Sequence, residues 1–341
     1  MSYVKNIQEK DNFLYFDLDN ESTKVNTALV NSIRRTILSD ISTWVIDEKS
    51  VMFTENTSNM DNEFMAHRLS LIPINSFMKD IDYSNVKMSC SKKNEEEDIL
   101  SIYASDFEVM DKSSGKKVEN SKIFPYPGML IAKLKYNQSV SFECQLEKNS
   151  VIEGGKSTHC PVCTCVHTYG IDKKEVEEFT KDMSVEEKRS FMTRDVERHY
   201  SKNKVGEPLI YKMTVESVGQ IPPKEIVKMA IELLKKRLDV FYHDLVTNHE
   251  RIEIRNSEVY EDIIELSVDG EDDTLGNLIT KYMGLDKDVL FSGYVIRHPT
   301  IRNVFMKYKL KENNNVEELI KKIEKVINEL TDILDKIKKA F

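Results

Sequence analysis

Residues 31–38, Asn-Ser-Ile-Arg-Arg-Thr-Ile-Leu, and residues 273–279, Asp-Thr-Leu-Gly-Asn-Leu-Ile, determine the fold that this sequence predicts. Each segment is expected to lie in an amphipathic helix that carries an asparagine, and each is followed by a β element, at 43–53 and at 289–296. A long helix with an apolar stripe comes later in both halves. Because the same plan occurs twice, we expect the chain to pair with itself and to act as a scaffold rather than as an enzyme.

Apolar residues recur every three or four positions in the predicted helices, which is typical of a helix with one buried face. Pro222 and Pro223 precede the first long helix, where proline is tolerated in the first turn. Asn315, with Glu318 three residues later, predicts the start of the second long helix. A shorter helix is expected at 274–283, with Asp273 as its N-cap and Gly284 just after its C-terminus. The residues expected to join the two halves are Leu234, Leu238, Phe241, Leu275, Asn277, Ile323, Ile327 and Leu330.

The segment 76–205 differs from its surroundings. Short runs typical of strands, at 99–103, 129–135 and 140–145, alternate with polar turns, and a charged stretch at 171–204 is expected to be helical and half exposed. We interpret 76–205 as a mostly β domain inserted into the first half. The predicted fold class is therefore α+β.

Composition limits the classes of protein to consider. The chain has 341 residues, 40% of them hydrophobic, and a net charge of −9. An acidic chain is not a typical nucleic-acid binder, so we expect contact with nucleic acid only indirectly, through partners. No apolar run is long enough for a membrane span, and the N-terminus resembles no secretory signal. Five cysteines do not predict a disulfide framework, so we expect a reducing compartment such as cytoplasm or nucleus.

The motifs at 31–38, 55–58, 63–74 and 215–223 resemble the assembly subunit of multisubunit RNA polymerases, which is alpha in bacteria, D in archaea and the third subunit in eukaryotes. Residues 272–299 resemble its smaller partner, archaeal L or the eukaryotic eleventh subunit. The resemblance implies a D-like dimerisation domain at 1–75 plus 206–255, the insertion domain at 76–205, and an L-like α+β dimerisation domain at 256–341. The two dimerisation domains would form an intramolecular pseudo-dimer, in a fused form like that of large DNA viruses with their own polymerase.

The same resemblance implies a non-catalytic platform of a DNA-directed RNA polymerase. Its expected partners are the largest and second-largest polymerase subunits and several small polymerase subunits. The residues expected at these subunit interfaces are Asn31, Arg34, Arg35, His67 and Arg68. Arg34 and Arg35 lie on a helix whose other face is apolar, and they also fit a solvated helix end. His67 also fits a structural role. We expect Arg35→Ala to weaken the capture of a large subunit without unfolding the chain.

One segment leaves an alternative open. Residues 158–167, Thr-His-Cys-Pro-Val-Cys-Thr-Cys-Val-His, hold Cys160, Cys163, Cys165 and His167, with His159 close by, and such residues can bind zinc. A zinc-binding transcription regulator is therefore the alternative function. However, no second Cys-x-x-Cys pair exists, and in the family this segment resembles a strand with small buried side chains. The family's own metal loop would fall near Cys90, where one cysteine remains, so we expect no cofactor.

A free-standing enzyme is the remaining alternative. The sequence holds no phosphate-binding Gly-Lys-Ser loop and no cluster of aspartates that could hold a catalytic magnesium ion. No acid–base pair or nucleophile constellation stands out either. We therefore expect no catalytic residue in this chain.

Overall fold

The computed structural model describes residues 2–260, 262–312 and 314–341. These residues form two compact units. Unit 1 comprises residues 1–36, 165–215 and 227–341, and unit 2 comprises 37–164 and 216–226. These compact units are defined differently from the domains predicted from sequence, which were 1–75 plus 206–255, 76–205 and 256–341. Those domain boundaries stay a prediction.

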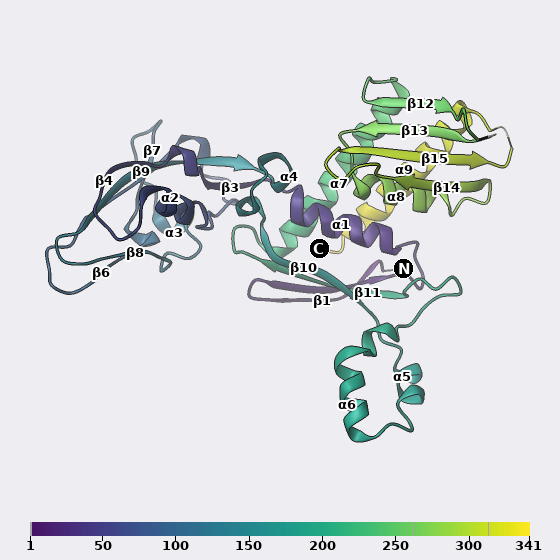
Figure 1. Ribbon diagram of the computed structural model, residues 1–341, viewed down its shortest axis with the longest axis horizontal. Coiled ribbons are helices and arrows are strands. Elements are labelled where there is room, and N and C mark those ends of the chain that lie inside the picture. Colours follow the sequence, from purple (N-terminus) through teal and green to yellow (C-terminus); the bar gives the residue numbers. More distant parts are fainter. Residues whose placement is uncertain (1, 261, 313) are drawn as a thin grey trace. The chain divides into compact units, whose positions relative to one another are not determined.

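Unit 1 contains a four-stranded sheet in the order β1-β2-β11-β10 (Figure 1). Its strands are β1 (Val4–Lys10), β2 (Phe13–Asp19), β10 (Val162–Tyr169) and β11 (Ile210–Ser217). The helix α1 (Thr27–Ser39) follows β2, and α7 (Pro223–Val246) follows β11. We call these six elements the first repeat.

A second four-stranded sheet in unit 1 has the order β12-β13-β15-β14, and all its neighbouring strands are antiparallel. Its strands are β12 (Ile252–Asn256), β13 (Ile264–Asp269), β14 (Val289–Val295) and β15 (Asn303–Leu310). The helix α8 (Asp273–Met283) follows β13, and α9 (Val316–Lys338) follows β15. We call these six elements the second repeat. Its chain order and its strand order both match those of the first repeat, element by element.

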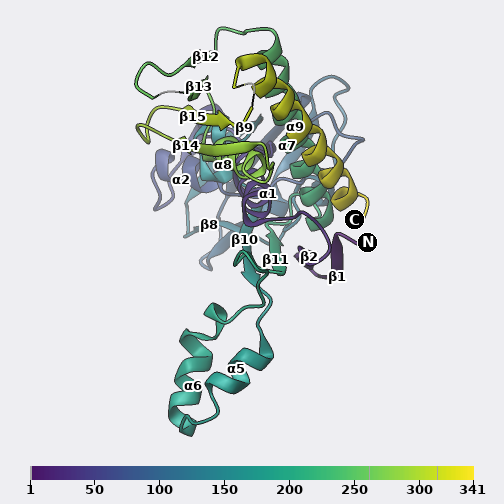
Figure 2. The same ribbon diagram turned by 90° about the vertical axis from the view of Figure 1, so that its right-hand side faces the viewer.

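The long helices α7 and α9 run beside each other, as two perpendicular views show (Figures 1 and 2). Lys235 of α7 pairs with Asp335 of α9 at 2.6 Å, and Lys338 of α9 pairs with Glu232 of α7 at 2.7 Å. Both apolar stripes are buried: residues Leu234, Leu238, Phe241, Ile323 and Leu330 have no exposed surface, and Ile327 is 4% exposed. Packing of these apolar faces, more than the intrinsic helix propensity of the residues, therefore stabilises both helices.

Two short helices, α5 (Lys173–Phe179) and α6 (Val185–Arg194), form a hairpin between β10 and β11. They share a small core of Val176, Phe191 and Val196, against which Met183 packs. The expected half-exposed helical character of 171–204 is confirmed.

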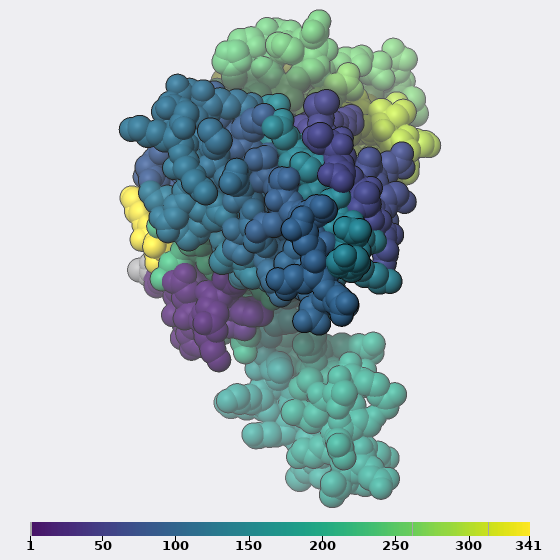
Figure 3. Space-filling view, turned by 90° about the vertical axis from the view of Figure 1, so that its left-hand side faces the viewer, coloured from purple at the N-terminus to yellow at the C-terminus, as the bar shows by residue number. Residues whose placement is uncertain are grey.

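Unit 2 is mostly β, and much of its surface is coloured blue in Figure 3. The 11-residue strand β9 (Ser139–Asn149) is central, since it pairs with β3 (Thr43–Ile46), β4 (Met52–Asn56) and β5 (Val86–Lys93), while β7 (Glu108–Asp111) pairs with β5. The strands β6 (Leu100–Tyr103) and β8 (Leu130–Leu134) form a separate pair. The helices are α2 (Asn62–Ser70), α3 (Asn120–Ile123) and α4 (Val151–Gly154).

Several predicted elements need correction. The expected strand at 43–53 is interrupted by a 3-10 turn at Glu48–Ser50, which Asp47 caps through its side chain. The cap of α8 is Asp272, not Asp273, because Asp272 has the extended backbone and its carboxylate accepts a hydrogen bond from Thr274 N. Gly284 ends α8 with a right-handed helical conformation, so it is not a left-handed terminator. The strands β1, β5, β7 and β15 were not predicted.

Within the described residues, no helix combines the length and the apolar character needed to cross a bilayer.

Candidate functional site

The helices α1 and α8 meet within unit 1 through Arg35. Arg35 Nε donates a hydrogen bond to the Thr274 hydroxyl at 2.8 Å, and its Nη2 lies 3.7 Å from the Asp272 carboxylate. Ser32, one turn earlier, donates to the Thr274 carbonyl oxygen at 3.3 Å. A helix N-terminus carries partial positive charge, so a cation beside the first turn of α8 would be repelled on its own. The negative charge of the Asp272 carboxylate makes the position of Arg35 favourable.

Two further arginines converge on the same end of α8. Arg237 of α7 donates to Glu271 at 2.7 Å through Nε and to Asp272 at 2.8 Å through Nη2. Arg302, from the β14–β15 connection, lies 3.6 Å from Asp272. Glu271 is buried, with 7% of its side chain exposed, and Arg237 is largely shielded, with 13% exposed. We call Arg35, Arg237, Glu271, Asp272 and Arg302 the ionic joint; it connects α1 and α7 of the first repeat to the second repeat.

The ionic joint changes the acidity of Asp272. Burial raises the pKa of the Asp272 carboxyl, but the Arg237 guanidinium, the hydrogen bonds from Thr274 and the nearby Arg35 outweigh it, so this pKa lies below the ordinary aspartate value. Asp272 is therefore ionised at neutral pH. Such a buried cluster is costly to break, because removal of one partner leaves an uncompensated charge.

All eight residues predicted to join the two halves lie in unit 1, and seven of them are buried. Leu275 of α8 has no exposed surface, like its counterparts on α7 and α9. The eighth, Asn277, is half buried and lines a cavity instead.

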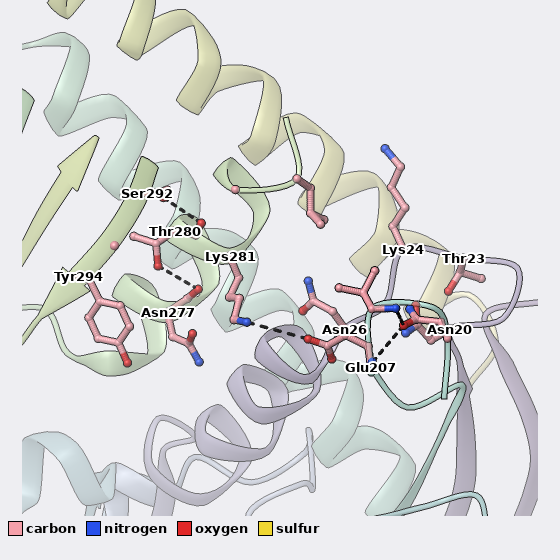
Figure 4. Close-up of a pocket in the computed structure, with 15 residues that line it drawn as sticks. Asn20, Thr23, Lys24, Asn26, Glu207, Asn277, Thr280, Lys281, Ser292 and Tyr294 are labelled. Atoms are coloured by element: carbon pink, nitrogen blue, oxygen red, sulfur yellow. Dashed lines mark hydrogen bonds and ion pairs between the residues drawn. The ribbon is translucent and has the colours of Figure 1, made fainter. Parts of the chain in front are cut away.

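The cavity, of about 600 Å³, lies beside α8 and β14 within unit 1 (Figure 4). Lys281 Nζ lies 4.0 Å from the Glu207 carboxylate. Glu207 accepts hydrogen bonds from the Thr27 hydroxyl at 2.8 Å and from the Tyr211 hydroxyl at 3.2 Å, so it is fixed at the first turn of α1. The residues that line the cavity are Asn20, Thr23, Lys24, Asn26, Asn203, Val205, Glu207, Asn277, Thr280, Lys281, Gly284, Leu285, Ser292, Gly293 and Tyr294.

The two ends of the α1–α8 contact are related by the repeat. When Leu29 is aligned with Leu275, Arg35 corresponds to Lys281, and Asp272 corresponds to Asn26. Each helix thus places a cation near the first turn of the other helix, where a carboxylate, Asp272 or Glu207, is bound. At the Asp272 end, the side chains of Arg35, Arg237 and Arg302 surround the carboxylate. At the Glu207 end, the contact borders the cavity.

The remaining predicted interface residues have different surroundings. Arg34 Nε donates to the Asn31 side-chain oxygen at 3.0 Å, and both are half buried on α1. In unit 2, Arg68 donates to the carbonyl oxygens of Ile131 and Leu130 at 2.8 and 3.0 Å, so part of its donor capacity is used within the chain. His67 is exposed beside it on α2.

The cysteine and histidine residues at 159–167 are not gathered into a cluster. Within residues 2–260, 262–312 and 314–341, no three His, Cys, Asp or Glu side chains are placed to hold a metal ion. Cys165 is buried on β10 whereas Cys163 is exposed, so the expectation of small buried side chains along this strand is wrong for Cys163. Burial raises the pKa of the Cys90 thiol to about 11.

His159 is fully buried in unit 2, and neither ring nitrogen has a hydrogen-bond partner among the described residues. Its Nε2 lies 3.6 Å from the Glu147 carboxylate. Burial lowers the pKa of His159, although Glu147 opposes that shift, so the imidazole is held neutral.

The sequence reasoning missed Asp272, Glu271 and Arg237. A signal for the first two exists, since three consecutive acidic residues, 271–273, precede Thr274, and acidic residues favour helix N-termini. No local signal distinguishes Arg237 from other basic residues on the polar side of α7.

Comparison with known families gives two matches along this chain. The RNA polymerase Rpb3/Rpb11 dimerisation domain matches residues 21–238, and a second family of the same description matches residues 263–339. The two matches include most of the first and second repeats.

Curated relatives are similar over most of their own length. RNA polymerase II subunit RPB3 of Schizosaccharomyces pombe is 30% identical over 253 residues, which cover 65% of this chain and 82% of the relative. The polymerase subunit Rpo3 of Pyrococcus horikoshii is 26% identical over 275 residues, or 72% of this chain and 98% of the relative. Subunit 3 of RNA polymerases II, IV and V of Arabidopsis thaliana is 25% identical, covering 69% and 89%.

Proposed function

The chain belongs to the RNA polymerase Rpb3/Rpb11 dimerisation-domain family, and we propose that it is a non-catalytic assembly platform that recruits the two largest subunits of a DNA-directed RNA polymerase. In this proposal its two Rpb3/Rpb11-type domains pair with each other inside one chain. The paired domains then present a shared docking face. The chain has no turnover alone, and the largest subunits provide the catalytic centre.

The observation that carries the proposal is the repeated architecture of unit 1. The sheets β1-β2-β11-β10 and β12-β13-β15-β14 have equivalent orders, and the helices of the two repeats contact each other through buried stripes and through the ionic joint. A pair of dimerisation domains needs this kind of contact. The order of the two family matches along one chain supports a fusion of D-like and L-like subunits.

The source we infer for such a fusion is a large DNA virus with its own polymerase. In that case the chain works in the virion and the host cytoplasm; in a cellular organism it works in cytoplasm or nucleus. Small polymerase subunits are further proposed partners, and nucleic acid is reached only through the assembled complex.

We assign docking of the large subunits to α1 and α2. Asn31 and Arg34 lie on α1 and are half buried, while His67 and Arg68 are exposed on α2. Arg35 is a less selective probe, because its loss also removes hydrogen bonds to α8. Arg34 therefore provides the sharper test of docking.

The test is affinity purification of the full chain, co-expressed with the two largest polymerase subunits of its own genome, followed by native mass spectrometry. We expect one copy of each large subunit per copy of this chain, and polymerase activity only in the assembled complex. Arg34→Ala should lower the recovery of a large subunit at least tenfold without a change in melting temperature. Lys321→Ala, at a 69%-exposed lysine of α9, is the matched control. Normal recovery with Arg34→Ala would refute the assigned docking residue, and absence of both large subunits from the wild-type complex would refute the platform.

A further inference from the structure

The strand β14 leaves one edge of the second sheet open. It is the outer strand of the order β12-β13-β15-β14, and its pairing partner among the described residues is β15 alone. Its sequence, Val-Leu-Phe-Ser-Gly-Tyr-Val, contains no charged residue and no proline, which are the usual protections of an exposed edge. Gly293 lies inside the strand, and a glycine there often marks the close approach of another backbone. This edge therefore has the properties of a pairing surface.

The sheet face away from α8 carries an apolar strip along this edge. Phe291, Gly293 and Val295 alternate onto that face, and Phe291 and Val295 are each 49% exposed. The Phe291 ring lies over Gly293, since a Cβ atom placed on Gly293 would lie 3.2 Å from it. On the neighbouring strand, by contrast, Phe305 is covered by the guanidinium of Arg297, at 4.1 Å from the ring centre.

The opposite face of the same edge adjoins the cavity of Figure 4. Ser292 and Tyr294 lie on this side, and Ser292 donates to the Thr280 carbonyl oxygen of α8 at 2.9 Å. The cavity is also lined by Lys24 and Lys281. Lys281 is 59% exposed and lies 4.0 Å from its one described carboxylate partner, so its ammonium group can bind a second carboxylate.

We propose that β14 binds an extended segment of a partner protein, which adds a fifth strand to this sheet. The segment carries apolar side chains that pack on Phe291 and Val295, and acidic or polar side chains, at the alternate positions, that enter the cavity toward Lys281. Main-chain hydrogen bonds supply affinity and the two alternating sets of side chains supply selectivity. A second copy of this chain fits less well, because residues 289–295 contain no acidic residue to meet Lys281.

This inference goes beyond the proposed function, since it names a mode of binding and a partner chemistry that the platform role does not require. It is tested on the full chain alone, so failure here leaves the recruitment of the large subunits untouched. The probe is a fluorescently labelled nine-residue peptide in which valine alternates with glutamate. A second peptide, with lysine in place of glutamate, tests whether binding requires negative side chains. A third, with every second backbone amide N-methylated, tests whether binding requires main-chain hydrogen bonds to β14.

We expect saturable binding of the glutamate peptide by fluorescence anisotropy, and slower hydrogen exchange of the β14 amides in its presence. Binding should be at least tenfold weaker for each altered peptide. Lys281→Glu should reverse the preference in favour of the lysine peptide, and Val295→Lys should weaken binding of the glutamate peptide. Lys321→Glu, which makes the same charge change on α9, should have no effect.

Three results would overturn the inference. The first is the absence of binding at millimolar peptide, and the second is equal binding of the N-methylated peptide. The third is a dimer of the wild-type chain in analytical ultracentrifugation that Val295→Lys abolishes, since that result assigns the edge to a second copy.

Discussion

Arg35 and Thr274 are 239 positions apart in the chain, yet Arg35 Nε donates a hydrogen bond of 2.8 Å to the Thr274 hydroxyl. This bond joins the helix of one repeat to the corresponding helix of the other. The arginine was expected at an interface with another subunit, and within this chain it already contacts the second repeat. We therefore expect a substitution of Arg35 to change the contact between the two repeats as well as the docking surface proposed on α1.

The ionic joint should dominate the electrostatic stability of unit 1. Arg237→Ala leaves the buried Glu271 and the partly buried Asp272 without their shortest ion pairs. We expect the free energy of unfolding to fall by about 3–5 kcal/mol, as is usual when a buried pair loses one partner. Lys235→Ala, two residues earlier on α7, removes a pair with Asp335, whose side chain is 41% exposed, and should cost about 0.2–1 kcal/mol. Urea denaturation followed by circular dichroism measures both, and equal effects would contradict a buried joint.

The apolar stripe of α7 offers a comparison between neighbouring residues. Phe241 has no exposed surface, whereas Val240 is 43% exposed. Phe241→Ala should lower the free energy of unfolding by about 3–5 kcal/mol, because it removes a large buried ring and leaves a cavity. Val240→Ala should change it by less than about 0.5 kcal/mol. The same denaturation assay distinguishes them, and a small effect of Phe241→Ala would show that this stripe is not in the core.

Alanine should destabilise the chain at one glycine of the α8 segment but not at the other. A Cβ atom on Gly276 would lie 2.7 Å from a methyl carbon of Val304 and 2.8 Å from the Tyr294 ring. Gly276→Ala should therefore destabilise the chain by about 1–3 kcal/mol through overpacking. At Gly284, the nearest atom to such a Cβ is the Thr280 carbonyl oxygen at 3.4 Å, and the backbone is already helical. Gly284→Ala should leave the stability unchanged or raise it by up to about 1 kcal/mol. Melting temperatures of the two variants test the contrast, which the reverse order would refute.

His159 should make the stability of unit 2 depend on pH. Burial lowers the pKa of this histidine in the folded chain, whereas the unfolded chain has the ordinary value of about 6.5. The unfolded state therefore binds the proton more readily, and the free energy of unfolding should fall as the pH drops from 7.5 to 5.5. His159→Leu should reduce this fall, because the variant has no imidazole to protonate. Denaturation midpoints at the two pH values provide the measurement, and an undiminished difference in the variant would contradict the prediction.

The helices and the repeat could be predicted from the amino-acid sequence. Every long helix was predicted because apolar side chains at intervals of three or four residues define a buried face without knowledge of what covers it. The motifs around Asn31 and Asn277 likewise marked corresponding helices in the two halves. Asn315 was correctly expected to cap α9, since its side chain accepts a hydrogen bond from Glu318 N.

The contacts between polar groups, in contrast, depend on the folded chain and could not be predicted. The partners of Arg35 and Arg237 come from segments far along the chain, and no periodicity encodes a long-range ion pair. The strand β15 was missed for a related reason. In Asn303–Leu310 buried residues alternate with lysines, and Lys307 and Lys309 pair with the carboxylates of Glu265 and Asp262, about 45 positions earlier in the chain. The cavity beside β14 and its open edge depend on the order of strands in the sheet, which pairing across the folded chain sets and local sequence does not.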